Sequence, residues 1–145
     1  MPLPRSDGRS VILVVEDEEL LRLYAAGLLE EAGFEVLEAV DADAALSIIE
    51  RRPDVHVLFT DIQLPGKLDG MELARKVHEQ WPRILLLVTS GRSRPSGAEI
   101  ADDGRFLAKP YTMRQLITEI DELEREAAAR GTIDRGRGRV VDPSS

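Results

Sequence analysis

Five short apolar runs alternate along the chain with segments in which apolar residues recur at helical spacing. The runs are residues 11–15, 35–39, 55–60, 84–88 and 106–108. Strand-length runs separated by helices are typical of a parallel sheet that helices cover on both faces. The sequence therefore predicts an α/β fold with a doubly wound, five-stranded parallel sheet. We expect the flavodoxin-like strand order 2-1-3-4-5, which places a ligand crevice outside the carboxyl ends of the strands.

Start and stop signals place helices between these runs. The expected helices are residues 18–32, 41–52, 69–81 and 112–130. Asp41 is a predicted N-cap. Two pairs have the spacing of a capping box: Asp69 with Glu72, and Thr112 with Gln115. One stripe of the first helix is expected to face the sheet, and it consists of Leu20, Leu21, Tyr24, Ala25, Leu28, Leu29 and Ala32.

The helical pattern fails between the fourth and fifth runs. Pro95 and Gly104 help to interrupt this stretch, so the fourth helix is expected to be short or irregular. Residues 1–9 and 131–145 are expected to be flexible ends, the second because of its Arg-Gly repeats. Residues 10–130 are then one domain, and residues 131–145 are too few to form a separate output domain. A solvated helix face is expected at Glu122, Glu124 and Glu126.

The composition is that of a soluble globular protein, with 43% hydrophobic and 32% charged residues. The formal net charge of −8 argues against general binding to nucleic acids or anionic membranes. Because the chain has no cysteine, disulfides, thiol nucleophiles and thiolate metal sites are excluded. No apolar stretch approaches the roughly 20 residues that span a bilayer, and the N-terminus lacks the apolar core of a signal peptide. We expect a cytoplasmic protein.

Polar and charged side chains stand at the carboxyl ends of four of the runs. They are Glu16 and Asp17 after the first run, Asp61 after the third, Thr89 after the fourth and Lys109 after the fifth. In a parallel sheet these ends meet at one edge, so three carboxylates, a hydroxyl and an ammonium are expected to converge. Clustered carboxylates repel one another unless a cation lies between them. The sequence therefore predicts a site for a cation and a phosphoryl group.

The oxygen ligands at this edge suit Mg²⁺, which pairs with one or two carboxylates and keeps several waters. Asp17 and Asp61 are expected to bind the ion directly, and Glu16 through a water molecule. The main-chain carbonyl of Gln63 is expected to supply a further oxygen.

Asp61 is also placed to act as a nucleophile that forms an acyl phosphate. Transfer of a phosphoryl group requires little from a protein beyond an in-line nucleophile and neutralisation of the equatorial oxygens. Mg²⁺ would neutralise one oxygen, Lys109 a second, and the Thr89 hydroxyl with nearby backbone N–H groups the third. Every role is then filled from the end of a strand.

Four sequence blocks around these residues carry a resemblance to a known family. They are residues 14–18 (VVEDE), 60–66 (TDIQLPG), 88–91 (VTSG) and 106–111 (FLAKPY). Residues 10–130 resemble a bacterial two-component response-regulator receiver domain of the stand-alone type. The resemblance implies that Asp61 accepts a phosphoryl group from a sensor histidine kinase or a histidine phosphotransfer protein, and that Mg²⁺ is required. It also implies that Thr89 and Phe106 form a coupled switch pair and that the peptide before Pro110 is cis.

The output of such a switch is expected to be a protein contact. Phosphorylation would favour a state in which Thr89 moves toward the phosphate and Phe106 turns inward. The downstream protein target is unknown from the sequence, and a phosphorylation-dependent homodimer is one form that the contact could take. No contact with a membrane and no direct binding of nucleic acid is expected.

Two other functions stay open at this point. A Mg²⁺-dependent phosphohydrolase can also use an aspartate nucleophile after a strand, but it usually needs a second aspartate two residues later, where this chain has Gln63. A phosphorylation-independent interaction module could retain only the fold. Such relatives usually lose an acidic residue or the lysine. This chain keeps all the residues concerned, which are Glu16, Asp17, Asp61, Thr89 and Lys109.

Overall fold

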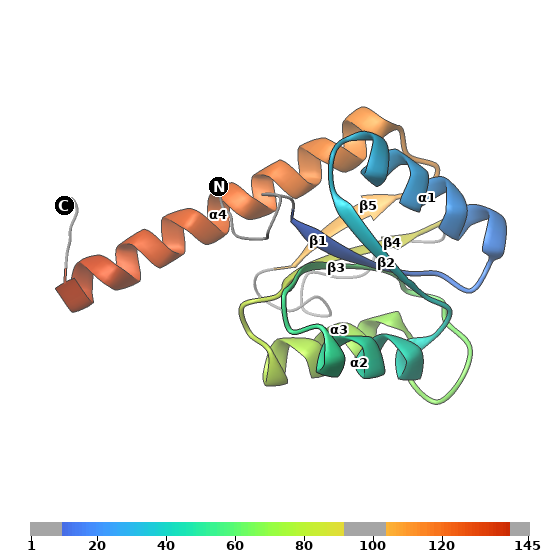
Figure 1. The fold of residues 1–145 in the computed structure, drawn as a ribbon, viewed down its shortest axis with the longest axis horizontal. Coiled ribbons are helices and arrows are strands. Elements are labelled where there is room, and N and C mark those ends of the chain that lie inside the picture. Colours follow the sequence, from blue (N-terminus) through green and yellow to red (C-terminus); the bar gives the residue numbers. More distant parts are fainter. Residues whose placement is uncertain (1–9, 92–103, 140–145) are drawn as a thin grey trace.

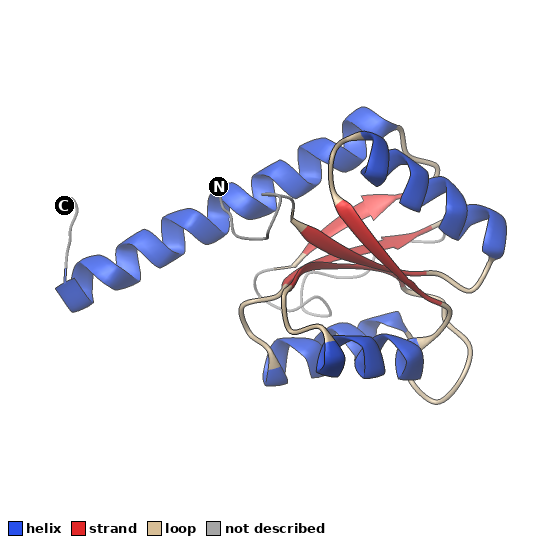
Figure 2. Ribbon diagram, in the orientation of Figure 1, coloured by secondary structure: helices blue, strands red, loops and turns tan. Residues whose placement is uncertain are grey.

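The computed structural model describes residues 10–91 and 104–139, and its strands form one parallel sheet. The strands are β1 (Val11–Val15), β2 (Glu35–Ala39), β3 (Val55–Asp61), β4 (Leu85–Ser90) and β5 (Arg105–Ala108). Their order in the sheet is β2-β1-β3-β4-β5. Figure 1 and Figure 2 show the sheet lying between two layers of helices. The predicted fold class and strand order are confirmed.

Helices cover both faces of the sheet. They are α1 (Glu19–Glu31), α2 (Ala42–Arg51), α3 (Gly70–Gln80) and α4 (Met113–Arg139). α1 and α4 lie on one face, and α2 and α3 on the other (Figure 1). Because side chains alternate along a strand, Leu13 of β1 packs in the core beneath α2 and α3, whereas Ile12 and Val14 pack beneath α1 and α4. The site therefore stands on a sheet that is buried on both sides.

The predicted caps define where three helices begin. The Asp41 carboxylate accepts a backbone N–H of the first turn of α2 at 2.9 Å. Asp69 and Glu72 form a reciprocal capping box at α3, with both hydrogen bonds at 2.9 Å. Thr112 and Gln115 do the same at the start of α4, at 2.9 and 3.1 Å. These polar side chains satisfy N–H groups that a helix leaves unpaired at its first turn.

The buried stripe of α1 is shorter than the sequence predicts. Ala25 and Leu29 are buried as expected, but the first turns of the helix are not covered by the sheet. The exposed members of the predicted stripe are Leu20, Leu21, Tyr24 and Ala32. Leu20 is 81% exposed and Tyr24 is 48% exposed. The prediction is wrong for these four residues. Leu21 and Tyr24 line an open pocket beside the turn after β5, whereas Leu20 lies in the first turn of α1 and Ala32 is its C-cap residue.

α4 is longer than the sequence predicts. It continues to Arg139 and projects beyond the sheet, so the predicted helix end at residue 130 is wrong (Figure 1). The sequence predicts that the helix ends before Gly131, because a glycine in a helix lowers stability by about 1 kcal/mol relative to alanine. Extending an existing helix requires no new nucleation, however, and the preceding Glu, Ala and Arg residues are strong helix formers.

Arg105 of β5 fastens α4 to the edge of the sheet. Its guanidinium lies 2.6 Å from Glu119, 2.7 Å from Glu122 and 3.0 Å from Glu126. The three carboxylates lie on one side of α4 because residues three and four apart are neighbours on a helix.

The predicted solvated face at Glu122, Glu124 and Glu126 is correct only in part. The three side chains are partly exposed, but Glu122 and Glu126 pair with Arg105, and the Glu124 carboxylate lies 3.1 Å from His56 Nε2.

Three sequence predictions fall outside the described residues. The irregular fourth helix falls on residues 92–103, and the flexible ends fall on residues 1–9 and 140–145. Within the ranges that the structure describes, no helix combines the length and the apolar character needed to cross a membrane.

Candidate functional site

The three predicted carboxylates meet at the carboxyl edge of the sheet. Parallel pairing sets Val15 opposite Thr60, so Glu16 and Asp17 emerge beside Asp61. The carboxylate oxygens that these residues offer all lie within 4.8 Å of one another. Glu16 and Asp61 are buried, whereas Asp17 is exposed. The cluster therefore has two fixed carboxylates and one that opens to solvent.

Lys109 is the cationic member of the site. Its Nζ donates to Glu16 Oε1 and to Asp61 Oδ2, both at 2.9 Å. Burial lowers the pKa of Lys109, but hydrogen bonds and charges from Asp61 and Glu16 outweigh it, so the pKa is raised. For Glu16, burial raises the pKa, and the hydrogen bond from Lys109 only partly opposes this rise. Three carboxylates and one ammonium leave two negative charges, which a divalent cation would balance.

The second oxygen of Asp61 has a partner in its own loop. The backbone N–H of Gln63 donates to Asp61 Oδ1 at 3.1 Å, while Oδ2 binds the Lys109 ammonium. The Gln63 side chain is in turn bound by the Ser90 hydroxyl, which donates to Gln63 Oε1 at 2.9 Å. The carboxylate of Asp61 is thus held in one orientation from two sides.

Thr89 lies opposite Asp61 in the pairing of β3 with β4. Thr89 is 3% exposed, and within the described part of the chain its Oγ1 is the one buried side-chain polar atom that lacks a hydrogen-bond partner. Buried hydroxyls normally have a partner. An unpaired hydroxyl one strand away from Asp61 is suited to an acceptor that arrives with a ligand.

Phe106 is part of the hydrophobic core. It pairs with Val88 across β4 and β5 and packs in the cluster beneath α2 and α3. Its side chain is buried, with 9% of the residue exposed. Phe106 therefore lies within β5, beside the strand that carries Thr89. The structure brings five predicted residues to one edge of the sheet: Glu16, Asp17, Asp61, Thr89 and Lys109.

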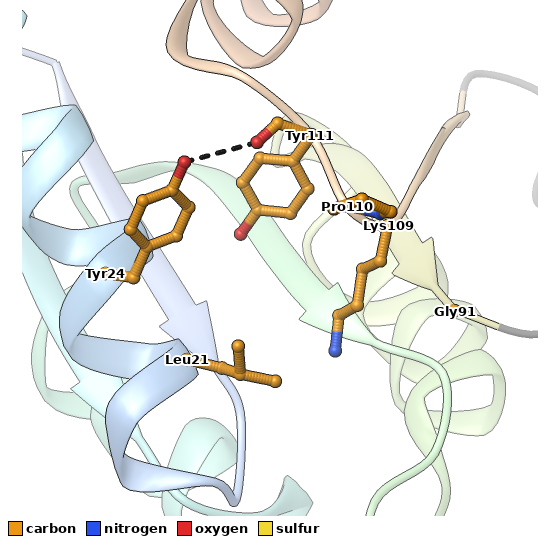
Figure 3. A pocket seen from close by; sticks show the side chains of 6 residues that line it. All are labelled: Leu21, Tyr24, Gly91, Lys109, Pro110 and Tyr111. Atoms are coloured by element: carbon orange, nitrogen blue, oxygen red, sulfur yellow. Dashed lines mark hydrogen bonds between the residues drawn. The ribbon is translucent and has the colours of Figure 1, made fainter.

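A pocket of about 430 Å³ opens beside Lys109 (Figure 3). Its lining residues are Leu21, Tyr24, Gly91, Lys109, Pro110 and Tyr111. The Tyr24 hydroxyl donates to the main-chain oxygen of Tyr111 at 3.3 Å, which joins α1 to the turn that carries Lys109. Burial, together with the charge of Glu16, raises the pKa of Tyr111. The Lys109–Pro110 peptide is cis, as predicted.

Gly70 is a residue of the site that sequence reasoning missed. A Cβ built at Gly70 would lie 1.8 Å from the main-chain oxygen of Asp61 and 2.8 Å from Cα of Ile62. The Gly70 N–H also donates to the main-chain oxygen of Ile62 at 2.8 Å. α3 therefore begins in direct contact with the peptide of Asp61. The sequence did contain a signal for this role. Glycine directly after the cap residue Asp69 is a poor helix former, and a close approach of another backbone segment would explain its presence there.

A mutation of Lys109 tests the charge balance of this site. Replacing Lys109 with methionine leaves Glu16 and Asp61 buried without their ammonium partner, and we expect a loss of about 2 kcal/mol in the free energy of unfolding. Urea denaturation at neutral pH measures this loss, and added Mg²⁺ should recover part of it. Lys76→Met on the exposed side of α3 is the control and should change stability little. A Lys109→Met protein as stable as the wild type would contradict the assigned charge pairing.

The chain matches a known protein family over most of its length. Residues 12–121 match the model of the response regulator receiver domain. The chain belongs to this family. Receiver domains are the phosphoryl-accepting signalling modules of two-component systems, and they bind Mg²⁺ at an acidic pocket. Receiver domains accept phosphoryl groups from histidine kinases, and in general they are signalling modules and not enzymes.

Curated relatives differ in how much of their length this receiver domain spans. The response regulator receiver protein CpdR of Brucella abortus is 30% identical over 115 residues, which are 77% of this chain and 94% of CpdR. The aerobic respiration control protein ArcA of Escherichia coli is 33% identical over 133 residues, which are 89% of this chain but 54% of ArcA. The chain spans only 13% of the sensor kinase CckA of Brucella abortus.

Solved structures agree with the receiver fold. A response regulator receiver protein from Sinorhizobium medicae superimposes with a TM-score of 0.77 at 28% identity, covering 84% of this chain and 99% of that chain. NtrX from Brucella abortus gives a TM-score of 0.78 at 31% identity, covering 91% of this chain and 31% of that chain. The receiver is therefore found both as most of a chain and as one part of a larger protein.

Proposed function

We propose that this receiver domain is a switch that accepts a phosphoryl group on Asp61. The observation that carries the proposal is the position of the Asp61 carboxylate, 2.9 Å from the Lys109 ammonium and within 4.8 Å of oxygens of Glu16 and Asp17. The donor would be a phosphohistidine of a sensor histidine kinase or of a histidine phosphotransfer protein. One oxygen of Asp61 would attack phosphorus, the P–N bond would break, and its electron pair would remain on the imidazole nitrogen.

Mg²⁺ is the proposed cofactor, and the donor set fits it. Glu16, Asp17 and Asp61 supply carboxylate oxygens and an uncompensated charge of minus two once Lys109 is counted. The main-chain carbonyl of Gln63 is the proposed fourth oxygen donor. Because Asp17 is exposed, one side of the cluster is open for the water molecules that Mg²⁺ retains. When bound, the ion would neutralise charge on the phosphoryl oxygens.

Two side chains of the protein would stabilise the phosphoryl group directly. Lys109 already contacts Asp61 and can donate to a phosphoryl oxygen attached there. The Thr89 hydroxyl is buried and unpaired, so it can donate to another oxygen without breaking an existing bond. Hydrogen bonds to charged oxygens are about twice as strong as neutral ones.

The partner that delivers the phosphoryl group needs access to Asp61. The proposed approach is the pocket beside Lys109, whose Nζ contacts Asp61 (Figure 3). Leu21 and Tyr24 line this opening, and Leu20, the residue before Leu21, is also exposed. They support docking of a protein donor, since apolar side chains that gather on a surface commonly mark interaction sites.

The proposed output is a protein contact made in the cytoplasm. Thr89 would move toward the phosphoryl group and Phe106, one strand away, would respond, so the phosphorylated population would differ at β4 and β5. This contact would involve a downstream protein or a second phosphorylated copy of the chain. Neither a membrane nor nucleic acid is a proposed direct partner.

Phosphorylation by a small donor tests the proposal. We expect incubation with acetyl phosphate and Mg²⁺ to add one phosphoryl group per chain, which intact mass spectrometry measures and peptide mapping should assign to Asp61. Chelation of Mg²⁺ should prevent the addition. Absence of labelling with acetyl phosphate and with every histidine kinase tested would favour a phosphorylation-independent interaction module. Sustained turnover of a phosphomonoester would favour a phosphohydrolase.

A further inference from the structure

Ser90 connects the two halves of the site. It follows Thr89 at the end of β4 and is 1% exposed. Its hydroxyl donates to Gln63 Oε1 at 2.9 Å, and its main-chain oxygen accepts the N–H of Lys109 at 3.0 Å. One buried residue is thus bonded both to the acidic loop after β3 and to the turn after β5.

The contact to Gln63 matters because Gln63 has two further roles. Its backbone N–H orients Asp61 Oδ1, and its carbonyl is a proposed ligand of Mg²⁺. Gln63 is itself exposed, so packing does little to hold it. The hydrogen bond from Ser90 restrains the side chain of Gln63 at its far end, and this restraint limits rotation of the residue as a whole.

We propose that Ser90 is a positioning residue that fixes Gln63, and through it the orientation of Asp61 and the Mg²⁺-binding loop. Ser90 does not contact the reacting atoms. This inference rests on the proposed function of the site. Ser90 would then be a further determinant of Mg²⁺ affinity. It lies on β4, between the strand that carries Asp61 and the strand that leads to Lys109.

Titration with Mg²⁺ by calorimetry tests this role. We expect Ser90→Ala to weaken Mg²⁺ binding about fivefold, which corresponds to the net free energy of a single neutral hydrogen bond. Ser90→Thr retains a hydroxyl and should recover most of the affinity. Ser47→Ala, an exposed serine that accepts a hydrogen bond from Arg51, is the control and should bind like the wild type.

A double-mutant cycle separates positioning from general damage. If Ser90 acts through the side chain of Gln63, Gln63→Ala should weaken Mg²⁺ binding as much as Ser90→Ala, and the double variant should be no weaker than either single variant. Losses that add in the double variant would overturn the proposal. Equal affinities of wild type and Ser90→Ala would do so as well.

Backbone amide resonances distinguish a failure of this inference from a failure of the proposed function. Recorded without Mg²⁺, the Gln63 N–H resonance should shift in Ser90→Ala and return toward its wild-type position in Ser90→Thr. An unchanged Gln63 resonance would overturn the positioning role. If the wild type binds no Mg²⁺, the metal site of the proposed function fails, and the Gln63 resonance alone decides the inference.

Discussion

Replacing Asp61 with asparagine is expected to abolish phosphoryl incorporation. The amide has nearly the shape of the carboxylate, but it is a poor nucleophile and carries no charge to bind Lys109 or a metal ion. Labelling by acetyl phosphate and Mg²⁺ should fall below detection by mass spectrometry. The control is Asp121→Asn, which changes an exposed acid on α4 and should be labelled like the wild type.

The same substitution should leave the fold intact. Lys109 would still hold its hydrogen bond to Glu16, which is 2.9 Å long in the wild type, so the ammonium would not be left unpaired. Circular dichroism and thermal unfolding should therefore resemble those of the wild type. A folded Asp61→Asn protein that retains the label would show that a different residue is the acceptor, and the assignment of Asp61 would have to be abandoned.

Replacing Gly70 with alanine is expected to be the most destabilising of the substitutions considered. The new Cβ would be placed 1.8 Å from the main-chain oxygen of Asp61, and real atoms do not approach so closely. Either α3 or the Asp61 peptide must move, and both are packed in the core. We expect a loss of about 3 kcal/mol in the free energy of unfolding, at the upper end of the usual cost of overpacking. Urea denaturation measures it.

Gly27→Ala is the matched control for this experiment. Gly27 lies within α1, and a Cβ there would meet no heavy atom within 4 Å. Since alanine is favoured over glycine in a helix by about 1 kcal/mol, this variant should be more stable than the wild type. The labelling rate of folded Gly70→Ala should also fall, because the displaced peptide carries Asp61, the proposed nucleophile. Wild-type stability and labelling in Gly70→Ala would mean that the contact relaxes at little cost.

The fold and the main residues of the site can be predicted from local patterns in the sequence. Apolar runs of strand length can pair only with one another, and their polar ends must then meet at one edge. Asp61 and Lys109 are far apart in the chain, yet each is the polar residue at the end of its run, so their meeting is predictable. The caps Asp41 and Asp69 are predictable for the same reason, since their hydrogen bonds reach only three residues along the chain.

The parts that sequence reasoning missed depend on distances between segments. Whether Leu21 is buried depends on what lies opposite this part of α1, and that is a pocket beside the turn after β5. The ion pair of Arg105 with Glu122 joins residues that lie 17 positions apart, and no local sequence pattern relates them. The role of Gly70 depends on how closely α3 approaches β3, which the hydrophobic pattern does not specify.

Asp61, the proposed phosphoacceptor, stands on the middle strand of the sheet. β3 has hydrogen-bonded neighbours on both sides, β1 and β4, and these are themselves flanked by β2 and β5. The main chain beneath Asp61 is therefore among the least able to shift when a ligand arrives. The conformational response to phosphorylation would therefore involve side chains and loops beside Asp61, which can rearrange while the backbone of β3 stays in place. A downstream protein would accordingly recognise the periphery of the domain, at a distance from the atom that carries the signal.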